Sequence, residues 1–121
     1  MKTNFLIMCD NAYLDENKKL NINGVFDAIF SPGFPAINKG MFVVVNFELP
    51  EGPHVEFTKI KKGSWEIKTP KTPITKERSG KHQFIHNFSN IVFPEEGEYS
   101  VEVYVDSQLI ASDILHIIKK A

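Results

Sequence analysis

One stretch near the C-terminus decides the fold: Glu96-Gly-Glu-Tyr-Ser-Val-Glu-Val-Tyr-Val-Asp106. Apolar side chains occupy every second position, and they fall on one face of an extended strand: Tyr99, Val101, Val103 and Val105. Strict alternation after a Gly-containing turn, followed by another apolar run, is typical of an antiparallel hairpin that is half-buried in a sandwich. The stretch predicts how the chain is built, and it carries no sign of a chemical activity.

Further segments extend this pattern along the chain. The cleanest is Met41–Leu49, in which every second residue is apolar, and no segment keeps the 3.6-residue period of a helix. We therefore predict an all-β fold, an antiparallel immunoglobulin-like β-sandwich of about 7–9 strands. The other predicted strands lie at Phe5–Cys9, which has apolar residues on both faces, Leu20–Phe30, from Val55, from Trp65, Gln83–Phe93 and Leu109–Ile118.

Three places depart from regular alternation. Ser31–Gly40 holds two prolines and two glycines and is predicted to be a loop. Thr69–Lys81 has almost no apolar content and two prolines, so we expect it to be the most mobile segment. Ile60 is out of phase with the apolar residues Val55 and Phe57, which predicts an irregularity near Thr58 or Lys59.

Length and composition indicate one domain, residues 1–121. The chain is 42% hydrophobic and contains ten Phe, which is enough material for a continuous core. The formal net charge of −1 gives no global field that would favour a nucleic acid or a membrane as partner. We therefore expect neither.

Cysteine content and the N-terminus bear on the compartment. Cys9 is the single cysteine, which excludes an intramolecular disulfide and the usual Cys-based zinc sites. The apolar run Phe5–Cys9 is shorter than the roughly 7–15-residue core of a signal peptide, and no window approaches the ~18 apolar residues of a membrane span. We expect a cytoplasmic protein. The same N-terminus also fits a protein exported without a signal peptide.

The order of several short motifs is familiar. The N-terminal part reads Cys9-Asp-Asn-Ala12, Lys19-Leu-Asn-Ile-Asn-Gly-Val-Phe-Asp27 and Phe34-Pro-Ala36, and the C-terminal part reads Phe93-Pro-Glu-Glu-Gly-Glu-Tyr99 and Val103-Tyr-Val-Asp106. This order resembles a family of small bacterial proteins of unknown function, DUF6941, over nearly its whole length. The resemblance implies a stand-alone sandwich of immunoglobulin-like type. It implies no catalytic or binding residues.

Candidate chemical sites are few, and each has a structural alternative that we favour. Cys9 beside Asp10 has the make-up of a nucleophile with a polar partner, but Cys9 ends an apolar run and fits a packed position. His82 and His86 share one face of a strand, where a weak surface metal site is possible. The acidic segment Asp10–Asn17 lacks the ligand pattern of a calcium loop, and a solvated connection fits it better. We predict no catalytic residue, no metal site and no cofactor.

Basic residues gather in the middle of the chain. Lys59–Lys81 contains eight of the fourteen Lys and Arg residues but only Glu66 and Glu77 on the acidic side. With Trp65 among them, this composition fits an aromatic platform for nucleic acid. We favour a different reading, in which Trp65 is core and the lysines protect edge strands from aggregation.

Three aromatic residues are candidate partner or ligand contacts: Phe34, Tyr104 and Tyr13. Phe34 lies in a Pro/Gly loop and either anchors a partner or plugs the end of the sandwich. Tyr104 points away from the apolar face of its strand. We predict a non-enzymatic β-sandwich that acts through protein–protein contacts, as a homo-oligomer or an accessory subunit. The alternatives are a small-ligand or carbohydrate-binding module that uses these rings, and then an enzyme of unrecognised type.

Tyr99 carries one further expectation. It follows a turn at the start of a strand, as does the tyrosine of the tyrosine corner in Greek-key sandwiches. We expect its ring at the core edge and its hydroxyl on a backbone group within Phe93–Glu96.

Overall fold

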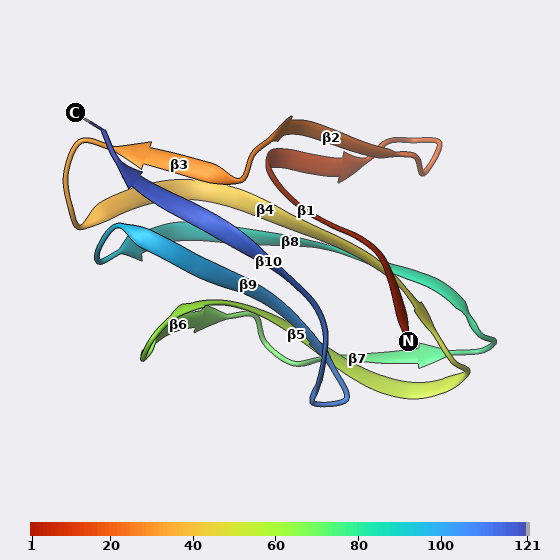
Figure 1. The fold of residues 1–121 in the computed structure, drawn as a ribbon. Helices are drawn as coiled ribbons and strands as arrows, with labels where there is room; N and C mark the ends of the chain where they lie inside the picture. The colour runs from red at the N-terminus through yellow and green to blue at the C-terminus, as the bar shows by residue number, and fades with distance from the viewer. Residues whose placement is uncertain (121) are drawn as a thin grey trace.

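Two β-sheets build the whole of the described chain (Figure 1). The computed structural model describes residues 1–120. The first sheet has the order β2-β1-β4-β8, from β1 (Lys2–Leu14), β2 (Leu20–Val25), β4 (Ala36–Leu49) and β8 (Gly80–Phe93). The second has the order β3-β10-β9-β5-β6, with β7 also paired to β5, from β3 (Ala28–Ser31), β5 (Gly52–Lys62), β6 (Trp65–Lys68), β7 (Thr72–Lys76), β9 (Gly97–Val105) and β10 (Gln108–Lys119).

The all-β prediction is confirmed, but residues 1–120 form ten strands instead of about 7–9. One additional strand arises because the predicted strand Leu20–Phe30 is divided between the sheets. The Phe26 amide donates to the Met8 carbonyl of the first sheet (3.0 Å), whereas the Asp27 carbonyl accepts from the His116 amide of the second (2.8 Å). The resulting β3 pairs with β10 in parallel, so the sheets are not wholly antiparallel. The immunoglobulin-like type stays a prediction, and residue 121 of the predicted domain lies outside the described residues.

The other additional strand is β7, and it corrects the expectation that 69–81 is a mobile loop. Residues 72–76 pair in antiparallel register with β5. Ile74, the single large apolar residue among them, is 6% exposed and packs into the core. Backbone hydrogen bonds to β5 and the buried Ile74 side chain therefore hold this segment in place, although its composition is mostly polar. The predicted loop at 31–40 is likewise shorter, because β4 already begins at Ala36.

The main core lies between the sheets, and β9 supplies its most regular row. The four alternating residues of the fold-determining stretch are all fully buried: Tyr99, Val101, Val103 and Val105. Across from them, β4 contributes Met41, Val43, Val45 and Phe47, each with no exposed surface. Both strands therefore follow the predicted alternation.

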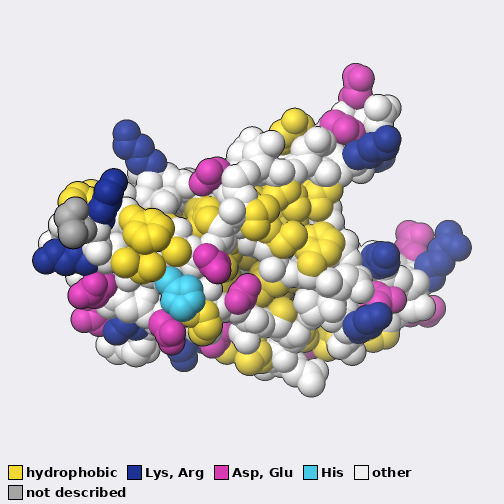
Figure 2. All heavy atoms as spheres, turned by 45° about the horizontal axis from the view of Figure 1, so that its top comes forward, with side chains coloured by type: hydrophobic (Ala, Val, Ile, Leu, Met, Phe, Trp, Pro, Cys, Tyr) yellow, Lys and Arg dark blue, Asp and Glu magenta, His cyan; other side chains and the backbone are white. Residues whose placement is uncertain are grey.

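A second apolar cluster covers the outer face of the first sheet. Cys9 and Val44 are completely buried there, although they point away from the main core. The pairing of β1 with β4 ends at Cys9, and beyond it β1 pairs with β2 alone. This hairpin projects from the body of the molecule next to a hydrophobic area (Figure 2). The prediction that Phe5–Cys9 is covered on both sides is confirmed, since its other residues, Leu6 and Met8, pack in the main core.

The tyrosine corner is present. The Tyr99 hydroxyl donates to the Glu95 carbonyl at 2.6 Å, inside the range that the sequence predicts. Its ring meets Phe93 at a centroid distance of 5.1 Å in an edge-on arrangement, and burial raises the pKa of the phenol. The turn between β8 and β9 is thereby tied to the edge of the core.

Tyr99→Phe should lower the free energy of unfolding by about 0.5–1.5 kcal/mol, because the part-buried hydrogen bond to the Glu95 carbonyl is lost while the ring stays. Tyr99→Ala should cost roughly 3–5 kcal/mol, since it also opens a cavity. Urea unfolding measures both. Tyr13→Phe, at a residue that is 47% exposed, is the control and should stay within about 0.5 kcal/mol of wild type. Equal urea midpoints for Tyr99→Phe and wild type would contradict a structural role for this hydroxyl.

Candidate functional site

From His54 to Thr58, strand β5 turns polar side chains toward the core and apolar ones outward. Its pairing with β9 keeps one register from Glu56 to Lys61, so the predicted irregularity near Thr58 or Lys59 is wrong. Ile60 is in phase with the polar residues of the strand, and Val55 lies on the opposite face, 39% exposed. The buried polar residues in the described part of the chain all belong to this strand: His54, Glu56 and Thr58.

Glu56 joins the two sheets. Its side chain has no exposed surface, and its Oε2 accepts hydrogen bonds from Thr58 Oγ1 (2.9 Å) and from His86 Nε2 (2.8 Å) on β8. A carboxylate oxygen only accepts, so this geometry assigns a proton to His86 Nε2. The second oxygen, Oε1, is buried without a partner. Sequence reasoning missed this residue, because its partner lies thirty positions away on the other sheet.

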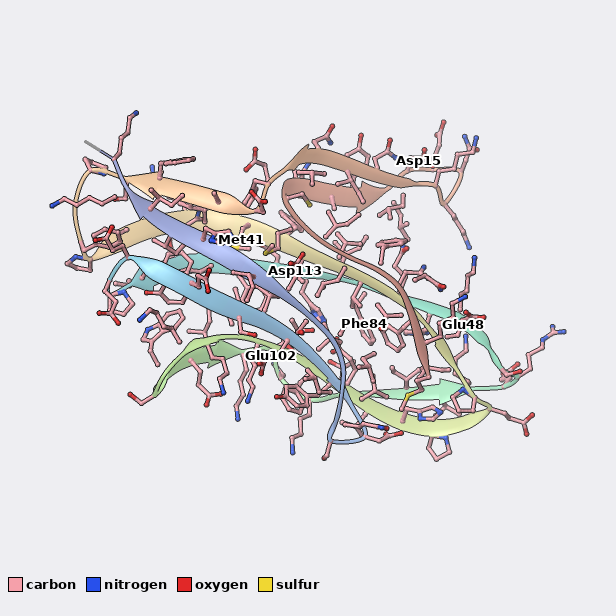
Figure 3. All side chains as sticks on the ribbon, viewed as in Figure 1. Asp15, Met41, Glu48, Phe84, Glu102 and Asp113 are labelled. Atoms are coloured by element: carbon pink, nitrogen blue, oxygen red, sulfur yellow. The ribbon has the colours of Figure 1, made fainter. Side chains whose placement is uncertain are left out.

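Around His86, β8 carries a row of rings on its inner face. Phe84 (Figure 3) stacks on His86 at a centroid distance of 5.2 Å and meets His82 edge-on at 4.9 Å. The predicted shared face of His82 and His86 is confirmed. Burial lowers the pKa of His82, and the nearby charge of Lys76 lowers it further. Residues 1–120 contain no group of three His, Cys, Asp or Glu side chains that could hold a metal ion.

A second histidine–carboxylate pair lies where β5 meets the β9–β10 turn. His54 Nδ1 is 2.7 Å from Asp106 Oδ2, and His54 Nε2 is 2.9 Å from the Pro50 carbonyl. Both partners only accept, so the doubly protonated ring satisfies both. The bond to Asp106 accordingly raises the pKa of His54, with the Pro50 carbonyl adding to it, and the same bond lowers the pKa of Asp106.

Cys9 and the acidic loop take part in packing and in turn formation. Burial raises the pKa of the Cys9 thiol, whose side chain is completely enclosed in the outer cluster. In the loop, Asp15 Oδ1 accepts from the amides of Asn17 (2.8 Å) and Lys19 (2.9 Å), and the Lys19 bond contributes most to lowering the pKa of Asp15. This carboxylate holds its own turn together.

The three predicted contact residues have different surroundings. Phe34 is partly buried against the main core, which is the packing role weighed against an anchor for a partner. Tyr13 is 47% exposed near the end of the projecting hairpin, opposite Asn21. Tyr104 lies on the outer face of the second sheet, where its hydroxyl donates to Glu102 at 2.8 Å. The structure does not bring them together into one site.

Tyr104 is engaged with its neighbours. Its ring stacks on Phe57 of β5 with a centroid distance of 4.9 Å and an interplanar angle of 8°. Lys59 Nζ lies over the Tyr104 ring at 4.9 Å, and Lys71 Nζ over the Phe57 ring at 5.9 Å. A sugar stacks on an open aromatic face, and here another ring and an ammonium group lie against these faces. The Tyr104–Phe57 pair therefore packs neighbouring strands of the second sheet against each other on its outer face.

The largest unused hydrogen-bonding surface is the outer edge of β8. Within residues 1–120, this 14-residue strand pairs with β4 alone. From Gln83 to Phe93 it contains no Asp, Glu, Lys, Arg or Pro. Those residues are the ones that natural proteins place on edges to stop another chain from pairing. The edge is open along most of its length.

The outermost strands at the other sheet edges are protected. β6 has only four residues, of which Glu66 and Lys68 are charged, and β7 contains Pro73. β2 has six residues, with Gly24 in the left-handed region (φ +69°), and β3 has four. Short length, charge, proline and irregular backbone each discourage pairing. β8 carries one such feature, Asn90 in the left-handed region (φ 51°), and from Gln83 to Ser89 it carries none. β10 leaves a shorter free stretch, at 108–115, because β3 pairs with it only from His116.

A groove of about 460 Å³ follows the C-terminal half of β8, on the side where the sandwich opens between β8 and β6. Four of its apolar residues are partly or fully buried, whereas Val92 is 47% exposed at the rim; the four are Trp65, Ile67, Phe88 and Ile91. Its remaining residues come from the β6–β7 connection and from β8: Lys68, Thr69, Pro70, Asn87, Ser89, Asn90 and Val92. The groove has an apolar floor and a polar, largely exposed rim.

Comparison with known proteins places the chain in a family. Residues 4–118 match a family of unknown function, DUF6941. The chain belongs to DUF6941. The resemblance carried by the Cys9–Ala12 and Phe93–Tyr99 motifs is thereby confirmed, and the match includes both β5 and β8. No curated protein matches this DUF6941 chain significantly.

One observation concerns membranes. The described residues of this DUF6941 member include no helix long and apolar enough to cross a bilayer.

His86→Leu should lower the free energy of unfolding by about 3–5 kcal/mol, because it leaves the buried Glu56 carboxylate without its strongest donor. The double variant Glu56→Leu/His86→Leu should cost clearly less than the single one, since no unpaired charge remains. Urea unfolding compares them, with the more exposed His116→Leu as control, expected within about 0.5 kcal/mol of wild type. Equal losses for the single and double variants would show that the Glu56–His86 hydrogen bond is not what matters there.

The His54–Asp106 pair predicts a pH dependence of stability. Because the pKa of His54 is raised in the folded protein, His54 adds to the free energy of unfolding. This stabilisation is complete below its usual pKa of 6.5 and is lost as pH rises through its pKa in the folded protein. Because the pKa of Asp106 is lowered in the folded protein, Asp106 also stabilises the fold. This stabilisation is present above its usual pKa of 3.8 and is lost as pH falls through its pKa in the folded protein. The pair therefore stabilises most between about pH 4 and pH 6.5.

Asp106→Asn tests this dependence. Asparagine keeps an acceptor for the Val55 amide (2.9 Å) and tolerates the left-handed backbone at this position (φ 52°). The gap in urea midpoint between wild type and variant should be widest near about pH 5.5 and narrow near about pH 9. A gap that stays constant over this range would rule out the charged pair as its cause.

Proposed function

We propose that this DUF6941 protein is a non-enzymatic binding module that takes up another polypeptide along β8. The observation that carries the proposal is the edge itself, fourteen residues long and without a charged residue or proline from Gln83 to Phe93. An exposed strand edge binds an extended chain through backbone hydrogen bonds, and neighbouring pockets select side chains. The groove beside β8 supplies such a pocket.

The state of the ionisable groups supports a role without catalysis. A general base must reach the proton that it removes. Both ring nitrogens of His54 already have partners within hydrogen-bond distance, and Glu56 and Cys9 have no exposed surface. These groups hold the fold together. The lone, enclosed thiol of Cys9 also supports the cytoplasmic location that we propose.

A polypeptide partner is better supported than a sugar. The rings proposed as stacking platforms are occupied, Tyr104 by Phe57 and Phe34 by the core. Along β8, in contrast, no strand pairs on the outer side within the described chain, although the Lys81 carbonyl near its start accepts from Lys76 Nζ (2.9 Å). The proposed binding surface is therefore a strand edge that binds its partner mainly through backbone hydrogen bonds.

An array of immobilised random decapeptides tests the proposal. The wild-type protein should bind a reproducible subset of the peptides. Asn87→Lys/Ser89→Lys should lose that subset, because lysines on an edge strand discourage pairing. The matched control, Gln108→Lys/Ser112→Lys, adds the same charge at exposed positions of β10, on the stretch that β3 does not cover and away from β8. It should bind as wild type does.

Both double variants are exposed substitutions and should unfold within about 0.5 kcal/mol of wild type per site. An array without reproducible binders, or an edge variant that keeps the wild-type subset, would overturn the proposal.

A further inference from the structure

We infer that the groove between β6 and β8 takes an extended, acidic segment of a partner protein whose alternate side chains are apolar. The inference rests on the proposed function and specifies its partner. It follows from the shape of the groove, from its charge and from the exposure of Trp65.

The shape selects an extended chain. The groove lies between edge strands of different sheets, and its β8 side runs from Asn87 to Val92. Six residues of a strand span roughly 20 Å, which sets the length of the segment that the groove holds. A chain paired with β8 on either side of Asn90, whose backbone is left-handed (φ 51°), would direct alternate side chains into the space between the sheets and the others toward solvent.

The floor selects apolar side chains at the inward positions. Trp65 and Ile67 of β6 are only partly buried, although both point toward the core. Trp65 contacts Tyr99 edge-on at a centroid distance of 5.3 Å and Phe93 at 5.8 Å. A side chain that entered from the groove would complete the cover of the indole, and apolar contact with Trp contributes strongly at interfaces.

The charge of the rim selects acidic residues at the outward positions. The groove is lined by Lys68 and by no Asp or Glu. The surrounding segment, 59–81, holds eight of the fourteen basic residues, while the whole chain has a net charge of −1. Lys68 is the basic residue at the groove itself, because Lys59 and Lys71 lie over the Tyr104 and Phe57 rings and Lys62 donates to Glu95 (2.8 Å). The charge of Lys68 favours a negatively charged partner.

The same charge disfavours a second copy of the chain. A two-fold pairing of two β8 strands would bring the two open sides together, each with Lys68 on its rim. Like charges that face one another across an interface lower affinity. A partner segment with acidic residues avoids this repulsion.

Trp65 provides the readout, since it is the only tryptophan of the chain and lies in the groove. The probe is an end-blocked octapeptide of alternating Glu and Val, titrated into the full chain at low salt. Binding should shift Trp65 emission to shorter wavelength and saturate. A Lys/Val octapeptide should bind at least about tenfold more weakly, because its charges match those of the rim.

Charge reversal on the protein locates the effect. Lys68→Glu should weaken the Glu/Val peptide about five- to tenfold, since it replaces an attraction by a repulsion at the rim. Lys119→Glu makes the same change at an exposed position of β10, on the other side of the second sheet, and should leave affinity unchanged. Raising the salt concentration should reduce the difference between the two peptides.

The outcomes separate the inference from the proposed function. Equal affinity for both peptides, or no effect of Lys68→Glu, overturns the acidic specificity, and the proposed function stands if the edge variant still loses binding on the array. A dimer in solution with Trp65 already shielded identifies a second copy as the occupant and also overturns the inference. If neither octapeptide binds and the array is empty, both fail.

Discussion

The arrangement of β5 and β8 depends on one requirement, that the carboxylate of Glu56 be paired inside the sandwich. The group has no contact with solvent, and an unpaired buried charge costs several kcal/mol. Its donors are Thr58 on the same strand and His86 on the opposite sheet. The histidine bond fixes how β8 lies over β5, because a hydrogen bond of 2.8 Å leaves little room for the sheets to slide.

This bond also explains how β8 persists as a long unpaired edge. Its inner face is anchored by Phe84, His86 and Phe88, and its inner backbone side pairs with β4 over nearly the whole strand. The strand needs no second neighbour to stay in place. No strand covers its outer backbone groups in the described chain, and the absence of charged residues and proline from Gln83 to Phe93 is the feature that the proposed function uses.

The aromatic residues show how position in the sandwich decides availability. The sequence offers Phe34 and Tyr104 as candidate contacts for a partner or ligand, but Phe34 packs on the core and Tyr104 stacks on Phe57. Trp65 looks like core and does contact Tyr99, but it lies at the open side between β6 and β8 and lines the groove. The side of a sandwich that lacks a covering strand leaves its core residues partly open, and no local pattern reveals which side that is.

The sequence by itself determined the all-β class, the buried faces of β4 and β9, the family and the Tyr99 corner. Each of these depends on residues close in the chain: alternation has a period of two, and Tyr99 meets a carbonyl four residues upstream. Only the tertiary structure decided the orientation of β5, the division of 20–30 between two sheets, the strand at 72–76 and the open edge. In β5 the polar residues face inward because Glu56 finds His86 across the sandwich, a partner that periodicity along one strand does not report. Alternation shows that a strand has two faces, and contacts between distant strands decide which face is buried.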